Sequence, residues 1–115
     1  MATKTFEVQT YRVALGDRMT GVADGQSINF RGYIVCNGAD GYHLVFYFLN
    51  PSSPVPSPSY LEEYKRGVVY LPFDQMHNYV DLLRNEKPMY AYMNSNSPQW
   101  NSIRTTNEPV GDEEM

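Results

Sequence analysis

The segment from residue 42 to residue 50, YHLVFYFLN, is apolar on both faces that an extended strand would present. Alternate side chains of a strand point to opposite faces, so Phe46 and Phe48 share one face while Val45, Tyr47 and Leu49 share the other. We expect Phe46 and Phe48 to pack in the core beneath a helix. The second face then also needs a cover, which a curling sheet or a second copy of the chain could supply.

The preceding apolar run, residues 28–36 (INFRGYIVC), predicts the antiparallel neighbour of this strand. Gly32 in the middle of the run indicates a bulge or a close backbone approach. The intervening NGADG contains both an Asn-Gly and an Asp-Gly pair, which are strong hairpin signals. The side chains expected on one face of this strand are Ile28, Phe30, Ile34 and Cys36.

The first alternating stretch, residues 4–15, slips in phase: Phe6 shares a face with Val8, whereas Tyr11, Val13 and Leu15 share the other. Either a bulge near Gln9 and Thr10 or a break into two short strands would restore one buried face. The following segment, GDRMTGVADGQS, is rich in Gly and Asp and lacks periodicity, and we interpret it as a loop.

Prolines interrupt the chain at residues 51–59, PSSPVPSPS. This segment predicts a stiff connection across an edge or an end of the sheet, although its P-x-x-P spacing would also suit a docking peptide. After it, residues 60–67 are expected to form one or two helical turns closed at Gly67. A short strand is then predicted over residues 67–72.

The clearest helix is predicted over residues 74–85. Asp74 is a suitable N-cap, Asn85 can take a left-handed exit, and Pro88 prevents continuation. The apolar positions at i, i+3, i+4 and i+7 form a single stripe. They are Met76, Tyr79, Val80 and Leu83.

Two further strands, residues 88–94 and 100–106, close the chain as a second hairpin around SNSPQ. Only one helix is long enough to cover a sheet face. The order of elements therefore predicts an α+β fold with a mostly antiparallel, curled or barrel-like sheet of about six strands and one main helix.

A chain of 115 residues with 42% apolar residues fits one globular domain, which we place at residues 1–107. Four of the thirteen acids lie in residues 108–115, which leaves nine acids against nine bases in the rest. The net charge of −4 therefore comes from a C-terminal tail that is expected to be frayed. A solubilising role for this tail, a functional acidic role and mimicry of nucleic acid all stay open.

Cys36 is the only cysteine, so the chain can form neither an intrachain disulfide nor a cysteine cluster for zinc. The first residues lack the apolar segment of a secretory signal, and no apolar run is long enough to cross a bilayer. We therefore expect a cytoplasmic protein that does not contact a membrane.

Candidate chemistry is sparse. His43 and His77 are the only histidines, and neither lies in a metal-binding spacing, although His77 and Asp81 are neighbours on the helix. Cys36 at the end of a strand lacks a feature that would lower its pKa. The glycine-containing segments are turns rather than phosphate-binding loops. The sequence therefore predicts no enzyme, no cofactor and no metal.

The residue types that enrich protein interfaces are abundant, with ten tyrosines, six methionines and twice as many arginines as lysines. We therefore expect a small non-enzymatic interaction or regulatory domain that is homo-oligomeric through an aromatic-rich sheet face and can also contact another protein. The candidate interaction residues are Arg31, Tyr33, Tyr47, Tyr90, Tyr92, Trp100 and Arg104.

Two alternatives remain. Tyrosines and arginines that share strand faces, such as Arg31 with Tyr33, could bind single-stranded nucleic acid by stacking and phosphate contacts. The neutral body argues against this, because affinity for nucleic acid depends largely on phosphate neutralisation. A small ligand or a sugar held by Tyr and Trp in a barrel mouth is the third interpretation.

Overall fold

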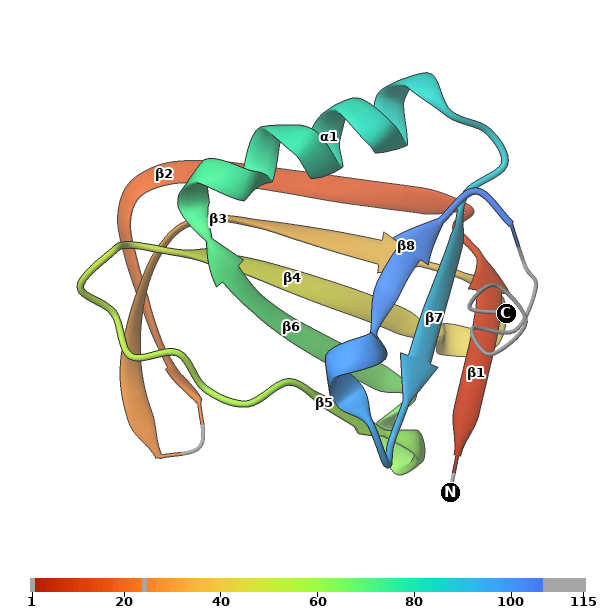
Figure 1. The fold of residues 1–115 in the computed structure, drawn as a ribbon, viewed down its shortest axis with the longest axis horizontal. Helices are drawn as coiled ribbons and strands as arrows, with labels where there is room; N and C mark the ends of the chain where they lie inside the picture. The colour runs from red at the N-terminus through yellow and green to blue at the C-terminus, as the bar shows by residue number, and fades with distance from the viewer. Residues whose placement is uncertain (1, 24, 107–115) are drawn as a thin grey trace.

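The computed structural model describes residues 2–23 and 25–106, and the predicted acidic tail at 108–115 lies outside these residues. Two β-sheets and one main helix make up the fold, which confirms the predicted α+β class (Figure 1). The two sheets are separate and do not close into a barrel. The fold has eight strands instead of about six, divided between the two sheets.

The larger sheet has five strands in the order β2-β3-β4-β6-β5. All neighbours are antiparallel except β4 and β6, which run parallel. A parallel pair needs a crossover connection, and the proline-rich segment with β5 and a following 3₁₀ turn provides it. The strands are β2 (Thr10–Ala23), β3 (Gln26–Asn37), β4 (His43–Leu49), β5 (Ser59–Leu61) and β6 (Arg66–Pro72).

The smaller sheet is antiparallel, in the order β1-β7-β8, with β1 at Thr3–Glu7, β7 at Tyr90–Asn94 and β8 at Ser102–Arg104. It therefore pairs the first strand of the chain with the last hairpin (Figure 1). The predicted break near residues 9 and 10 is confirmed, since β1 and β2 belong to different sheets. The phase slips there because β1 turns Phe6 into the core from the smaller sheet, whereas β2 belongs to the larger sheet.

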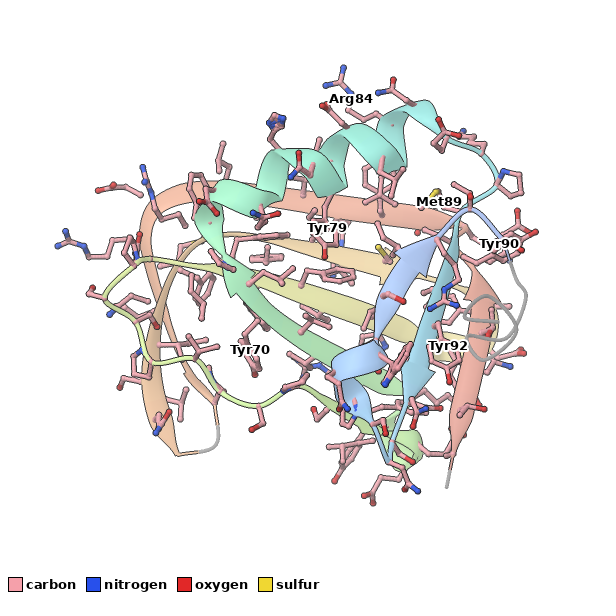
Figure 2. All side chains as sticks on the ribbon, viewed as in Figure 1. Tyr70, Tyr79, Arg84, Met89, Tyr90 and Tyr92 are labelled. Carbon is pink, nitrogen blue, oxygen red and sulfur yellow. The ribbon has the colours of Figure 1, made fainter. Side chains whose placement is uncertain are left out.

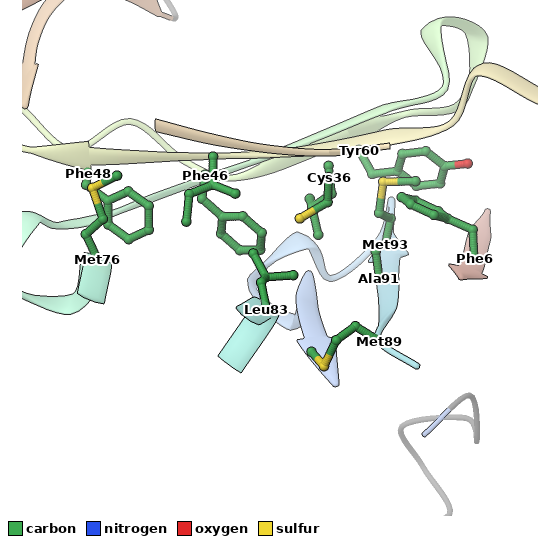
Figure 3. Close-up of a cluster of buried hydrophobic side chains, with 12 residues drawn as sticks. Phe6, Cys36, Phe46, Phe48, Tyr60, Met76, Leu83, Met89, Ala91 and Met93 are labelled. Carbon is green, nitrogen blue, oxygen red and sulfur yellow. The ribbon is translucent and has the colours of Figure 1, made fainter. Parts of the chain in front are cut away.

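Helix α1 (Met76–Asn85) and the smaller sheet pack on the same face of the larger sheet (Figure 3). Phe46 and Phe48 are fully buried there, as predicted, and both rings contact Tyr79 of α1, at centroid distances of 5.0 and 5.6 Å. The predicted apolar stripe of the helix faces this core. The core cluster contains Phe6, Ile34, Cys36, Leu44, Phe46, Phe48, Tyr60, Met76, Leu83, Met89, Ala91 and Met93.

The loop predicted for residues 16–27 is wrong. Strand β2 continues to Ala23 and β3 begins at Gln26, with a register shift between Leu15 and Met19. Pairing along β3 outweighs the local preference of Gly and Asp for turns, since β-propensity depends strongly on cross-strand contacts.

Phe30 also lies on a different face from the one expected. A register shift between Phe30 and Gly32 removes Phe30 from the core and turns it to the outer face of the sheet. The close approach predicted at Gly32 is confirmed, because a Cβ atom there would overlap the sulfur of Met76. A bulge bends the strand and re-aims its side chains, which explains both observations.

The ends of the helical segments differ in detail from the prediction. Asp74 lies in a 3₁₀ turn, Phe73–Gln75, that precedes α1, and its side chain makes no capping hydrogen bond. Glu86 after the helix is extended, so Asn85 does not provide a left-handed exit. Within residues 60–67 only Glu62–Tyr64 form a 3₁₀ turn, which ends at left-handed Lys65 instead of Gly67; the flanking residues belong to β5 and β6.

Two further 3₁₀ turns join strands: Ala39–Gly41 in the hairpin between β3 and β4, and Pro98–Trp100 between β7 and β8. Both predicted hairpins are therefore confirmed. In the described residues no helix combines the length and apolar character needed to cross a membrane.

The outer face of β4 is covered in part by the sheet itself. Beyond the register shifts, the β2–β3 hairpin bends, and Ile28 and Phe30 pack with Leu49 in a second buried cluster. Met19 and other half-buried side chains complete this cluster. Curling of the sheet thus covers the Leu49 end of the face. Toward the other end Val45 is also buried, between Val35 and Val68, and His43 is half-buried.

Candidate functional site

Four aromatic rings form a row on the outer face of the larger sheet. We call Phe30, Tyr33, Tyr47 and Tyr70 the aromatic face; they come from β3, β4 and β6. Tyr33 and Tyr70 lie opposite Tyr47 in the two neighbouring strands, so cross-strand pairing builds the row. The three tyrosines are half-buried.

The rings of this row pack mainly against one another. Tyr47 and Tyr70 are stacked at 5.7 Å with an interplanar angle of 14°, and Phe30 meets Tyr47 edge to face at 5.1 Å. Tyr33 is tilted against Tyr47 at 6.1 Å. Ring faces that pack on neighbouring rings are less open to a base, and the polar tips of the tyrosines suit contact with a protein surface.

A hollow of about 350 Å³ lies beside these rings, toward the His43 end of the face. Its ionisable side chains, apart from tyrosines, are Arg12, His43 and Arg66, with no carboxylate among the lining residues. Arg66 donates from Nη2 to the Tyr47 hydroxyl at 3.4 Å. The complete lining is Arg12, Phe30, Tyr33, Val35, His43, Val45, Tyr47 and Arg66.

A second candidate surface is the β2 edge, which we define as Val13 and Leu15 with the outer backbone edge of residues 10–15. Strand β2 has β3 as its one strand neighbour in the described structure. Val13 and Leu15 are 43% and 70% exposed. They line a shallow hollow with Phe73 and Val80, and its rim carries Asp74, His77, Asp81 and Arg84.

The predicted interaction residues divide between distant surfaces. Tyr33 and Tyr47 meet in the aromatic face, but Tyr90 and Tyr92 lie on β7 of the smaller sheet, well apart from Tyr70 (Figure 2). Arg104 on β8 pairs with Tyr90 across the strands and lies over the Tyr92 ring at 4.8 Å.

The remaining two predicted residues lie elsewhere. The guanidinium of Arg31 is 4.6 Å from the ring centroid of Phe73, just before the helix, and the bulge at this point separates it from Tyr33. Trp100 lies in a 3₁₀ turn and is 38% exposed. The predicted pairing of Arg31 with Tyr33 on one face is therefore wrong.

Several residues of the two surfaces were not among the interaction residues predicted from the sequence. They are Arg12, His43, Arg66 and Tyr70 on the outer face, and Val13 and Leu15 at the edge. Tyr70 and Arg66 join the face because β6 lies parallel to β4. The available signal was the alternation of GVVYLP, which places Val68 and Tyr70 on one strand face.

The groups considered for chemistry lie apart from one another. Cys36 is fully buried, and burial raises the pKa of its thiol to about 12. His77 and Asp81 form an exposed pair at 3.8 Å on α1. Within residues 2–23 and 25–106, no three His, Cys, Asp or Glu side chains are grouped as a metal site would require.

A polar cluster lies near the crossover, where the exposed carboxylate of Glu62 accepts hydrogen bonds from two tyrosine hydroxyls. Tyr60 donates to one oxygen, and Tyr42 donates to the other at 3.0 Å. These bonds, Tyr60 first, lower the pKa of Glu62, and Lys4 and Lys65 add to the effect. Both lysine ammonium groups also lie over the Tyr42 ring, at 4.5 and 5.1 Å.

Replacement of Glu62 by glutamine should reduce the loss of stability in acid. The pKa of Glu62 is lower in the folded state than in the unfolded state. The ionised carboxylate therefore stabilises the fold above its unfolded pKa, and this stabilisation is lost as the pH falls through its folded pKa. We expect the wild type to lose more stability than Glu62→Gln between pH 6 and about pH 3, measured by urea unfolding. Glu63→Gln, which changes the adjacent exposed acid, is the control; an acid response equal to that of Glu62→Gln would contradict the prediction.

The aromatic face and the β2 edge are thus the two surfaces with the composition of a binding site. One is an aromatic surface bordered by positive charge. The other is a strand whose outer edge has no strand neighbour among the described residues and is bordered by apolar side chains. Comparisons of the chain with protein-family models, with curated proteins and with solved structures found no match.

Proposed function

We propose that this chain is a small, non-enzymatic interaction domain of the cytoplasm that self-associates by pairing the β2 edges of two copies. The observation that carries the proposal is the unpaired edge of β2, bordered by Val13 and Leu15. An exposed apolar edge strand is a template for pairing with another strand. A cytoplasmic location suits a chain whose only cysteine, Cys36, is a free buried thiol.

A two-fold axis at Val13 supports this arrangement, because the strand segment is complementary to itself. Val13 would lie opposite Val13 of the second copy, and Tyr11 opposite Leu15. Tyr11, Val13 and Leu15 lie on the helix side of β2. Their partners in β3 are, in the same order, the core residues Cys36 and Ile34 and the close-packed Gly32. Pairing would therefore join two apolar surfaces and place no like charges opposite each other.

Charges beside the edge also favour an antiparallel pair. Helix α1 runs along β2 (Figure 1). Asp74 lies in the turn just before the helix and Arg84 lies in its last turn, and both line the hollow. The two-fold axis would set the helices of the two copies antiparallel. The Asp74 end of one helix would then lie beside the Arg84 end of the other, which is electrostatically favourable.

The aromatic face is less suited to self-pairing than the sequence suggested. Its border carries Arg12, His43 and Arg66 without an acid, so two such faces would bring like charges together. The proposal therefore assigns self-association to the β2 edge.

A double substitution, Val13→Lys with Leu15→Lys, should convert the dimer into a monomer. Inward-pointing charges on an edge strand oppose edge-to-edge pairing, so we expect the dissociation constant to rise at least about tenfold, equivalent to about 1.4 kcal/mol. Sedimentation equilibrium over a range of protein concentrations measures this constant.

Val22→Lys is the matched control, because Val22 is 76% exposed on the same strand but lies beyond the register shift. It should associate like the wild type. A wild-type protein that stays monomeric at about 100 µM, or a Val22→Lys protein that dissociates as readily as the double variant, would overturn the proposal.

A further inference from the structure

We propose that the aromatic face is a binding site for the acidic segment of the chain itself, residues 108–115. This inference goes beyond self-association through the β2 edge and does not depend on it. It names a ligand for the second surface of the molecule: an acidic peptide that carries a few apolar side chains.

Charge complementarity is the first argument. Arg12, His43 and Arg66 border the face, and neither arginine has a carboxylate within ion-pair distance in the described part of the chain. Residues 108–115 contain Glu108, Asp112, Glu113 and Glu114 and no base. A site that concentrates cations and a segment that concentrates acids attract each other at moderate ionic strength.

The shape of the face is the second argument. Tyr47 and Tyr70 are stacked on each other, and Phe30 meets Tyr47 edge to face, so these rings are engaged with one another and less available to stack on bases. What the face offers is apolar ring surface with hydroxyl tips and arginines, a combination enriched at protein interfaces. Pro109, Val110 and Met115 can cover such surface while the acids pair with the arginines.

The length of the chain permits the contact. Strand β8 ends at Arg104, and the described residues end at Thr106. The nine residues that follow could span about 30 Å when extended, and the described molecule measures 36 × 32 × 30 Å. The segment can therefore reach the outer face of the larger sheet in the same copy or in a neighbouring one.

Amide NMR spectra of the full chain test the proposal. The neutral-tail variant E108Q/D112N/E113Q/E114Q changes no residue of the described body. At low salt, we expect its amide signals in β3, β4 and β6 near Tyr33, Tyr47 and Tyr70 to shift from the wild-type positions. High salt should move the wild-type signals to those of the variant, because screening releases the segment.

Substitution of the face gives the reciprocal test. R12E/R66E should abolish the salt dependence of the signals from residues 108–115, whereas R18E/K87E, with the same change in net charge, should preserve it. V13K/L15K should also preserve it, which distinguishes this contact from self-association at the β2 edge. The proposal fails if neutralising the tail leaves the amide signals of the aromatic face unmoved. It fails in the same way if those signals respond to a single-stranded oligonucleotide but not to neutralisation of the tail.

Discussion

Replacing Phe46 by alanine should lower the free energy of unfolding by about 3–5 kcal/mol. The Phe46 ring is fully buried in the core (Figure 3). It contacts the ring of Tyr79 on α1. Its neighbours across the sheet are Ile34 and Val69. Because strands hold these neighbours on both sides, they cannot collapse fully into the space that the ring leaves, and a cavity term adds to the lost burial.

Urea unfolding at a fixed protein concentration measures this effect, since self-association would otherwise contribute to the apparent stability. Tyr64→Ala is the control: it also truncates an aromatic ring, but one that is 64% exposed. The control should change the stability by less than about 0.5 kcal/mol. Equal losses for the two variants would mean that the core is not centred on β4.

The second large effect is expected at Gly67 on β6, which packs closely against Met93 of the smaller sheet. A Cβ atom on Gly67 would lie 2.6 Å from the sulfur of Met93 on β7 and 2.8 Å from Cδ1 of Leu44 on β4. Both side chains are fully buried, so neither has free space to move into. Gly67→Val should therefore destabilise the protein by about 1–3 kcal/mol through overpacking.

Gly16→Val provides the comparison for this substitution. The nearest atoms to a Cβ on Gly16 belong to the flexible side chain of Met19, at 3.5 Å or more. We expect little change in its unfolding midpoint in urea. A Gly67→Val protein as stable as the wild type would show that β7 does not pack directly on β6.

The sequence by itself predicts the elements that depend on patterns among nearby residues. The stripe from Met76 to Leu83 places one face of the helix, and the Asn-Gly and Asp-Gly pairs place the turn between β3 and β4. The phase slip before Thr10 marks the point where the chain changes sheets. These features depend on neighbours a few residues apart, so they can be read along the chain.

Only some residues of the candidate surfaces could be predicted from such local patterns. Tyr33 and Tyr47 follow from the predicted hairpin, because a register set by a short turn also sets which side chains lie opposite. The other predicted residues were chosen by type, and residue type alone does not say which sheet a strand joins. Tyr90 and Arg104 accordingly lie on the smaller sheet, away from the aromatic face.

Only the tertiary structure decided how distant segments combine. The parallel pairing of β4 with β6 brings Tyr70 and Arg66 beside Tyr47, and the bulge at Gly32 turns Phe30 outward to join them. The same structure leaves β2 at an edge, which exposes Val13 and Leu15. Such pairings are selected by the burial of whole faces and by competition among strands, and these are properties of the assembled chain that no local pattern contains.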